Sequence, residues 1–186
     1  MQQTGLRQTS GLLLNRVIDT PKITLQPISL EFISEIHSGY THEVAKFLYA
    51  QPCKKLSDTA RRIEFAIEQM RLGLQSNFQI RDNETDSFIG CANVRHHKPK
   101  SPPRLAFWLK EEWQHRGFGT ETYMALKKYI DSTLIYEFLV IKILDENIAA
   151  KHLLKKIGAK ELDEIFMLKI NEHGVKNRLI TYRIYR

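Results

Sequence analysis

The residues best suited to chemistry in this 186-residue chain lie in one stretch, residues 105–130, which reads LAFWLKEEWQHRGFGTETYMALKKYI. A strand-like apolar run leads into the turn at residues 114–120, and a helical pattern starts within that turn. Glycines at such a junction let the backbone approach a ligand closely, and the first helical N–H groups carry the positive end of the helix dipole. The stretch therefore predicts a site for a phosphate or pyrophosphate group.

Two other phosphate-binding motifs do not fit this turn. A P-loop ends in G-K-[ST], whereas Gly119 is followed by Thr120 and Glu121. A dinucleotide-binding fingerprint needs a third glycine or alanine, and residue 122 is threonine. Such a fingerprint also follows the first strand of its unit, whereas a β-hairpin is predicted before this turn. Glycine also occurs in tight turns for purely steric reasons. The two glycines alone therefore do not identify a ligand site, and the elements around the turn must be considered with them.

Hydrophobic periodicity predicts the elements that position the turn. Strands are expected at residues 22–27, 78–80, 88–94, 105–109, 138–144, 165–170 and 178–184, with a hairpin turn at 82–86. Helices are expected at 30–37 after Ser29, at 42–49, from Ser57 and Asp58 through the stripe Ile63, Ile67, Met70 and Leu74, from the glycine turn to residue 130, and over residues 150–157 before Gly158. This order favours one mixed α/β domain.

Length and composition limit the class of protein. The chain is 42% hydrophobic and 26% charged, as in ordinary globular proteins, and its length favours one domain, at residues 21–186, after a flexible N-terminal extension at 1–20. The two cysteines, Cys53 and Cys91, lack the spacing of a disulfide framework or a zinc module, so no metal is expected. No apolar stretch is long enough to span a bilayer, and no signal peptide is evident. A cytoplasmic protein is therefore expected.

The net charge of +7 is unevenly distributed. Residues 151–186 contain nine Lys or Arg and four Asp or Glu. Such an excess attracts anions, which could be a nucleic-acid backbone, a phosphorylated small molecule or an acidic protein surface. A solvated basic face without a partner fits equally well, so charge alone leaves the function open.

The pattern Q-x-x-G-x-G at a strand-to-helix turn, followed by a strand and then DENIAA at residues 145–150, resembles the GNAT family of acetyl-CoA-dependent N-acetyltransferases. The stretches IDTPKITLQPI and EVAKFLYAQP are similar to the branch that contains the bacterial ribosomal-protein N-terminal alanine acetyltransferases. The resemblance runs from about Ile18 to the C-terminus. It implies the α/β GNAT fold, with a mixed, strongly twisted central β-sheet flanked by helices.

The resemblance also implies where acetyl-CoA would bind as co-substrate. In the family its pyrophosphate lies on the turn that corresponds to residues 114–120, and its pantetheine arm pairs with the strand that precedes the turn. That strand and the one at residues 138–144 splay apart around the thioester. The implied cofactor-binding residues are Phe107, Trp108, Leu109, Gln114, Arg116, Gly117, Phe118, Gly119, Thr120 and Asn147. Asn147 can also cap the helix that it precedes.

The sequence departs from the family at the positions that move protons. Ala150 and Leu154 stand where many relatives carry a serine or a tyrosine that protonates the thiolate, and Arg104 stands where an acidic residue often opens the strand. The catalytic residues therefore stay unassigned. His96 and His97 follow the second hairpin strand, whose end faces the acceptor in this family, and histidine titrates near neutral pH. His96 is the candidate general base.

The resemblance predicts an enzyme that transfers an acetyl group to a primary amine by direct attack in a ternary complex. The leading acceptor is the N-terminal α-amine of a peptide or protein. A small-molecule amine acetyltransferase, a catalytically degenerate CoA-binding protein and a basic module that docks on RNA or the ribosome stay open as alternatives. Membrane and nucleic-acid partners are not expected, and the chain is expected to be a monomer or a homodimer.

Overall fold

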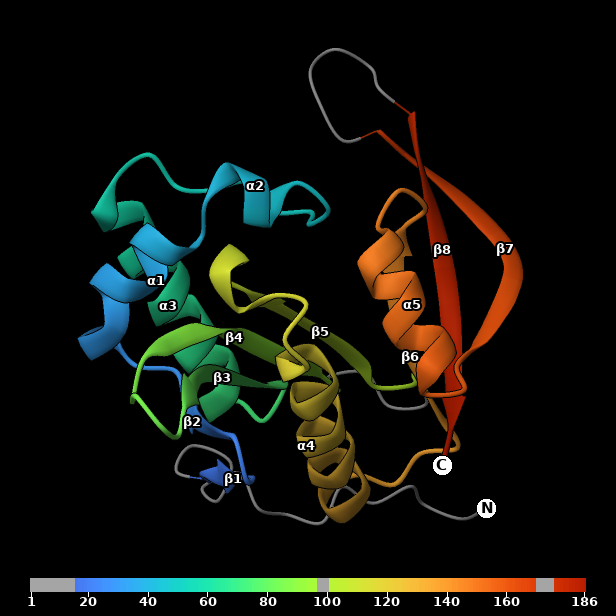
Figure 1. The fold of residues 1–186 in the computed structure, drawn as a ribbon, viewed down its shortest axis with the longest axis horizontal. Coiled ribbons are helices and arrows are strands. Elements are labelled where there is room, and N and C mark those ends of the chain that lie inside the picture. Colours follow the sequence, from blue (N-terminus) through green and yellow to red (C-terminus); the bar gives the residue numbers. More distant parts are fainter. Residues whose placement is uncertain (1–15, 97–100, 170–175) are drawn as a thin grey trace.

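The computed structural model describes residues 16–96, 101–169 and 176–186 (Figure 1). Within them, eight strands form one mixed sheet in the order β1-β2-β3-β4-β5-β6-β8-β7. The strands are β1 Ile18–Asp19, β2 Ile23–Pro27, β3 Gln75–Asp82, β4 Phe88–Arg95, β5 Arg104–Leu109, β6 Phe138–Leu144, β7 Lys160–Lys169 and β8 Lys176–Tyr185. The helices are η1 Leu30–Phe32, α1 Ile33–Gly39, α2 His42–Ala45, α3 Leu56–Arg71, η2 Glu111–Trp113, α4 Phe118–Thr133 and α5 Ile148–Lys156. The predicted mixed sheet with flanking helices is confirmed.

Helices cover both faces of the sheet because successive strand residues point to opposite faces. On β4, Ile89 belongs to the main core with Leu126 of α4 and Leu154 of α5. Its neighbour Phe88 packs on the opposite face with residues of α1 and α3, among them Ile63. The face toward α1 and α3 and the face toward α4 and α5 are therefore separate environments.

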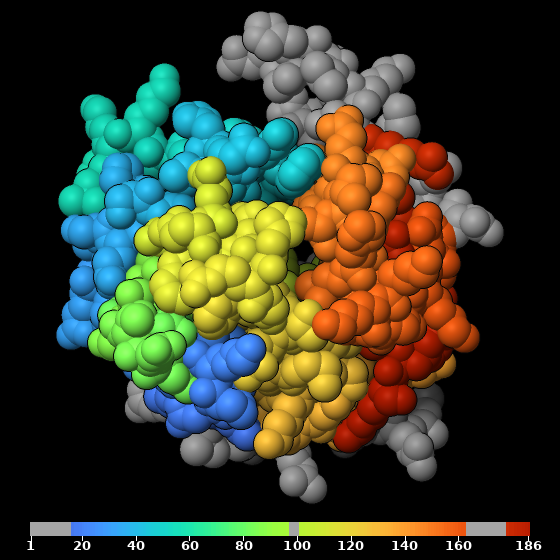
Figure 2. Space-filling view, viewed as in Figure 1, coloured from blue at the N-terminus to red at the C-terminus, as the bar shows by residue number. Residues whose placement is uncertain are grey.

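The parallel strands β5 and β6 meet at one point and then separate. Arg104 and Val140 are their single registered pair, and the Val140 N–H donates to the Pro103 carbonyl at 2.9 Å. By contrast, β6 stays in register with β8 from Phe138 to Leu144. The space-filling view shows the surface hollowed between the yellow η2 segment and the orange α5 (Figure 2). The sheet is thus open beyond Arg104, on the side toward the C-terminal ends of β5 and β6.

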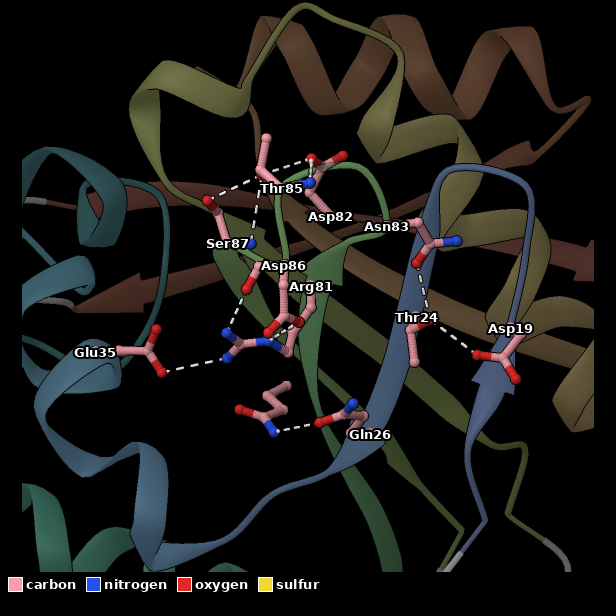
Figure 3. A network of polar contacts seen from close by, with 11 residues as sticks. Asp19, Thr24, Gln26, Glu35, Arg81, Asp82, Asn83, Thr85, Asp86 and Ser87 are labelled. Atoms are coloured by element: carbon pink, nitrogen blue, oxygen red, sulfur yellow. Dashed lines mark hydrogen bonds and ion pairs between the residues drawn. The ribbon is translucent and has the colours of Figure 1, made fainter.

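The turn between β3 and β4 is closed by its own side chains (Figure 3). Arg81 donates from Nε to Asp86 Oδ1 at 2.8 Å and from Nη1 to Glu35 Oε2 of α1 at 3.3 Å. The Asp82 carboxylate accepts from the Thr85 N–H at 3.0 Å and from its hydroxyl at 2.7 Å. These bonds fix the predicted hairpin and attach it to α1.

Several element boundaries differ from the sequence expectations. Regular structure begins before Lys22, because Ile18 of β1 pairs with Leu25 of β2. Most of the predicted N-terminal extension, residues 1–15, lies outside the described residues. The helix expected at 42–49 is only α2, and the strand expected from residue 165 begins earlier, as β7.

Helix α3 also differs from its prediction at both ends. It begins after Lys55 instead of at the polar residues that follow, and it ends before Leu74, which the predicted stripe had included. The reason for its end is Gly73, whose φ of 67° is left-handed, so that the Leu74 N–H bonds back to the Gln69 carbonyl at 3.0 Å. Gly158 ends α5 in the same way, as predicted, with a φ of 72°.

Candidate functional site

The turn that joins β5 to α4 presents backbone donors. His115 and Gly117 both have left-handed backbones, with φ of 58° and 89°, and Gly117 is the N-cap of α4. The first bond of the helix runs from the Glu121 N–H to the Gly117 carbonyl at 3.1 Å. Residues 118–120 therefore carry the first-turn N–H groups that have no partner inside a helix. A glycine N-cap has no side chain to accept from them, so these donors are available to an anion.

Gly119 faces β5, and the surrounding protein leaves room for a small side chain at this position. An added Cβ would lie 3.8 Å from the Phe107 ring and 4.0 Å from Leu109 Cδ1, which is ordinary van der Waals contact. A small side chain would therefore fit in the fold. Packing within the fold therefore does not explain the glycine, whereas close approach of a ligand to this backbone would.

The other predicted residues of the turn hold it in shape. Gln114 Nε2 donates to the Leu109 carbonyl at 2.9 Å, which ties the turn to the end of β5. The exposed Arg116 guanidinium lies over the Trp113 ring, 4.7 Å from its centre, and 5.5 Å from the centre of the buried Phe118 ring. Gln114 thus positions the loop, whereas Arg116 keeps its charge at the surface beside the first-turn donors.

One edge of β5 faces the gap. The Lys110 N–H donates to the Ile89 carbonyl at 2.8 Å, so the backbone groups of Lys110, and by alternation those of Trp108, point toward β4. The backbone groups of Phe107 and Leu109 then point toward β6, where the ladder has already ended. This edge can pair with an extended ligand arm.

The N-terminus of α5 lies at the same C-terminal end of β5 and β6 as the glycine turn. Because β5 and β6 are parallel, the helices that follow them both begin there. Asn147 is the N-cap of α5, and its Oδ1 accepts from the Ala150 N–H at 3.0 Å. The predicted capping role of Asn147 is confirmed, and the gap is flanked by the N-termini of α4 and α5.

Comparison with protein families identifies the family of the chain. Residues 22–160 match the model of an acetyltransferase (GNAT) domain. The chain belongs to the GNAT acetyltransferase family. The sequence has no significant match among curated proteins.

Solved structures share the GNAT fold at low sequence identity. One is an acetyltransferase that modifies the N-terminal serine of ribosomal protein L7/L12 in Salmonella typhimurium, with TM-score 0.80, 14% identity, and 92% of this chain and 99% of that chain covered. Another is the microcin C7 self-immunity acetyltransferase MccE in complex with acetyl-CoA and AMP, with TM-score 0.77, 18% identity and coverage of 90% and 94%. A third is a GCN5-related N-acetyltransferase from Brucella melitensis, with TM-score 0.78, 12% identity and coverage of 92% and 79%. The TM-scores show that the fold is shared, and at these identities they show the fold alone.

The structure does not bring His96 to the gap. His96 follows Arg95, which pairs with Arg104 at the closed end of β5 and β6. Its N–H donates to the Leu74 carbonyl at 3.1 Å, and its Nε2 lies 3.5 Å from Ser76 Oγ. His97 lies outside the described residues. The register therefore gives no support to His96 as the base of this GNAT protein.

Sequence reasoning missed Tyr40, which lies against Trp108 on the α1 and α3 face of β5. The two ring centres are 5.0 Å apart, and Phe88 completes the cluster 5.8 Å from Trp108. The Tyr40 hydroxyl donates to the Ala50 carbonyl at 2.6 Å. Burial raises the pKa of Tyr40 to about 12. No local pattern links these residues, because the cluster forms only when α1 packs on the sheet.

Within the described residues, no group of three or more His, Cys, Asp or Glu is arranged to hold a metal ion. In the same part of the chain, no helix is both long and apolar enough to cross a membrane.

Proposed function

We propose that this GNAT protein transfers the acetyl group of acetyl-CoA to a primary amine, the N-terminal α-amine of a peptide or protein, by direct attack in a ternary complex. The observation that carries the proposal is the gap beyond Arg104, where β5 and β6 separate between the N-termini of α4 and α5. An extended thioester with an anionic end matches an open strand edge beside helical N–H donors.

The residues present fit such a donor. The first-turn N–H groups of residues 118–120, with the nearby Arg116 guanidinium, would hold the pyrophosphate. The gap-facing backbone of Phe107 and Leu109 would pair with the pantetheine arm, and Asn147 would contact it from α5. The glycine N-cap Gly117 and the side-chain-free Gly119 leave this backbone open.

Acetyl-CoA supplies, when bound, an acyl group activated as a thioester. The chain contributes orientation, because it holds the amine and the thioester in contact and so lowers the entropic cost of their reaction. The backbone N–H groups of β5 that face the gap can donate to an acyl oxygen as negative charge develops on it. The amine nitrogen bonds to the acyl carbon as the carbon–sulfur bond breaks, and the amine must lose a proton.

The proton path uses water in this proposal. At the two positions where relatives carry an acid, Ala150 has only a methyl group and Leu154 is buried with 2% of its surface exposed. Neither can protonate the departing thiolate. Water in the open gap can accept the proton that the amine loses and can donate a proton to the departing thiolate of CoA.

The choice of a peptide α-amine is supported by the structural neighbour that modifies the N-terminal serine of a ribosomal protein. The test measures thiol release from acetyl-CoA with a panel of peptides, polyamines, aminoglycosides and amino acids. We expect release with peptides that have a free N-terminus and none with the same peptides blocked at that amine. Release with only the small amines would overturn the peptide assignment, and CoA binding without release from any acceptor would indicate a protein that binds but does not transfer.

A further inference from the structure

A basic pocket of about 670 Å³ lies at the start of α3, away from the residues assigned to acetyl-CoA. It is lined by Pro52, Cys53, Lys54, Lys55, Asp58, Arg61, Arg62 and Phe65. Four of these side chains are cationic and one is anionic. Neither the CoA assignment nor the fold accounts for this concentration of charge.

The lysines of this pocket are available to a ligand. Arg61 forms an ion pair with Asp58, and Arg62 donates to the Gln51 carbonyl at 2.7 Å. Lys54 and Lys55 are exposed, and within the described residues neither has an ion-pair partner. The uncompensated positive charge of the pocket is therefore centred on these two lysines.

The position of the lysines is unfavourable for the helix that they precede. Lys55 is the N-cap of α3, with no side-chain cap hydrogen bond, and Lys54 comes just before it. A cation at a helix N-terminus opposes the macrodipole, where Ser, Thr, Asp or Asn would be stabilising. Functional and strained sites are where sequences are expected to break local rules of this kind.

The pocket lies at the start of α3, the helix that packs on the same face of the sheet as Trp108. Ile63 of α3 belongs to the same cluster as Trp108 and Phe88. Tyr40, whose ring is tilted against that of Trp108, bonds to the Ala50 carbonyl just before the lining begins, and the charge of Arg62 acts on the Tyr40 hydroxyl. Tyr40 thus lies between Trp108 of β5 and the pocket lining, where residues that follow the amine of a bound peptide would pass.

We infer that the pocket binds acidic side chains of the acceptor peptide downstream of its N-terminal amine, with Lys54 and Lys55 as specificity-determining residues. The inference rests on the proposed function and adds the class of acceptor to it. Two apolar walls, Pro52 and the 63% exposed Phe65, suit the aliphatic stems of Glu and Asp side chains. A pocket of this volume holds a few side chains, whereas an RNA strand would need basic residues spread along its backbone.

The experiment measures binding by fluorescence anisotropy, with CoA present. Three short peptides share the same free N-terminal residue and a C-terminal fluorophore, and differ only in carrying acidic, neutral amide or basic side chains after the first residue. We expect the acidic peptide to bind at least tenfold more tightly than the neutral one. The double variant Lys54→Glu/Lys55→Glu should remove this preference and improve binding of the basic peptide.

The matched control is Lys22→Glu/Lys128→Glu, which reverses two exposed lysines far from the pocket and changes the net charge equally. It should keep the tenfold preference, because only a local contact survives screening at physiological salt. The milder variant Lys54→Gln/Lys55→Gln repeats the test if charge reversal impairs folding.

The outcomes separate this inference from the proposed function. Equal affinities for the three peptides, with normal thiol release, would overturn the inference alone. An acidic preference without any thiol release would support the inference and overturn the function. A short RNA that displaces the acidic peptide at submicromolar concentration would assign the pocket to nucleic acid and overturn the acidic-acceptor assignment.

Discussion

The turn between β3 and β4 and the turn between β5 and α4 both contain left-handed residues, yet their polar groups are used in opposite ways. Asp86 has a φ of 53°, and Arg81 donates hydrogen bonds both to its carboxylate and to that of Glu35 in α1. Around Gly117, the N-cap has no side chain, and the first-turn donors of α4 are left uncapped. The first turn stabilises the fold, and in the proposed function the second donates to the pyrophosphate of acetyl-CoA.

The comparison predicts that damage to the two turns has separate consequences. Changes at the hairpin should lower stability and leave CoA affinity intact, whereas changes at the glycine turn should do the reverse.

The largest effect is expected at Gly119. Replacing it with leucine extends a bulky side chain toward Phe107 and Leu109, at the edge of β5 proposed for the pantetheine arm, and CoA affinity should fall well over tenfold, or by about 1.4 kcal/mol or more. Calorimetry with CoA measures the change. Gly119→Ala is the matched control, since its Cβ would make only ordinary contacts with Phe107 and Leu109 and should keep the melting temperature. Unchanged affinity in Gly119→Leu would remove the turn from the cofactor site.

At the hairpin, Arg81→Ala should cost about 1 to 3 kcal/mol of unfolding free energy, because the 12% exposed side chain loses charge-assisted bonds to Asp86 and Glu35. Urea unfolding measures the loss. CoA affinity should stay within twofold of the parent at a temperature where the variant is folded. A parallel loss of CoA affinity would show that the two turns are coupled, contrary to the comparison.

Asn147 caps α5 and is also proposed to contact CoA, and two substitutions can separate these roles. Asn147→Ala removes the cap of α5 and should cost about 1 kcal/mol of stability, whereas Asn147→Ser keeps a capping oxygen and should cost less. If the amide also contacts CoA, both variants should weaken CoA binding by a few-fold. Parent-like CoA affinity in Asn147→Ser would leave Asn147 with the capping role alone.

The smallest effect is expected at Ala150. Ala150→Ser adds a hydroxyl at the position where relatives carry an acid, and turnover measured by thiol release should be preserved or raised. The half-buried site and the unchanged backbone bond to Asn147 should keep the helix in place. Abolished turnover with parent CoA affinity would mean that this helix is misaligned with the family.

The sequence by itself determined the features that depend on neighbours along the chain. The periods of residues 78–94 and 138–144 predicted the hairpin strands and β6, and the glycines at 117 and 119 predicted the strand-to-helix turn. These succeeded because alternation, helix stripes and left-handed glycines are local properties of the backbone. Local pattern failed at helix ends such as that of α3, where Gly73 and its Schellman-type bonds ended the stripe before Leu74.

Only the tertiary structure decided which residues share a site. The separation of β5 from β6 after Arg104 and Val140 depends on pairing between segments far apart in the sequence, and so does the position of His96 at the closed end. The contact of Tyr40 with Trp108 arises from the packing of α1 on the sheet. Each of these follows from burying apolar faces against one another, which no short window of sequence specifies.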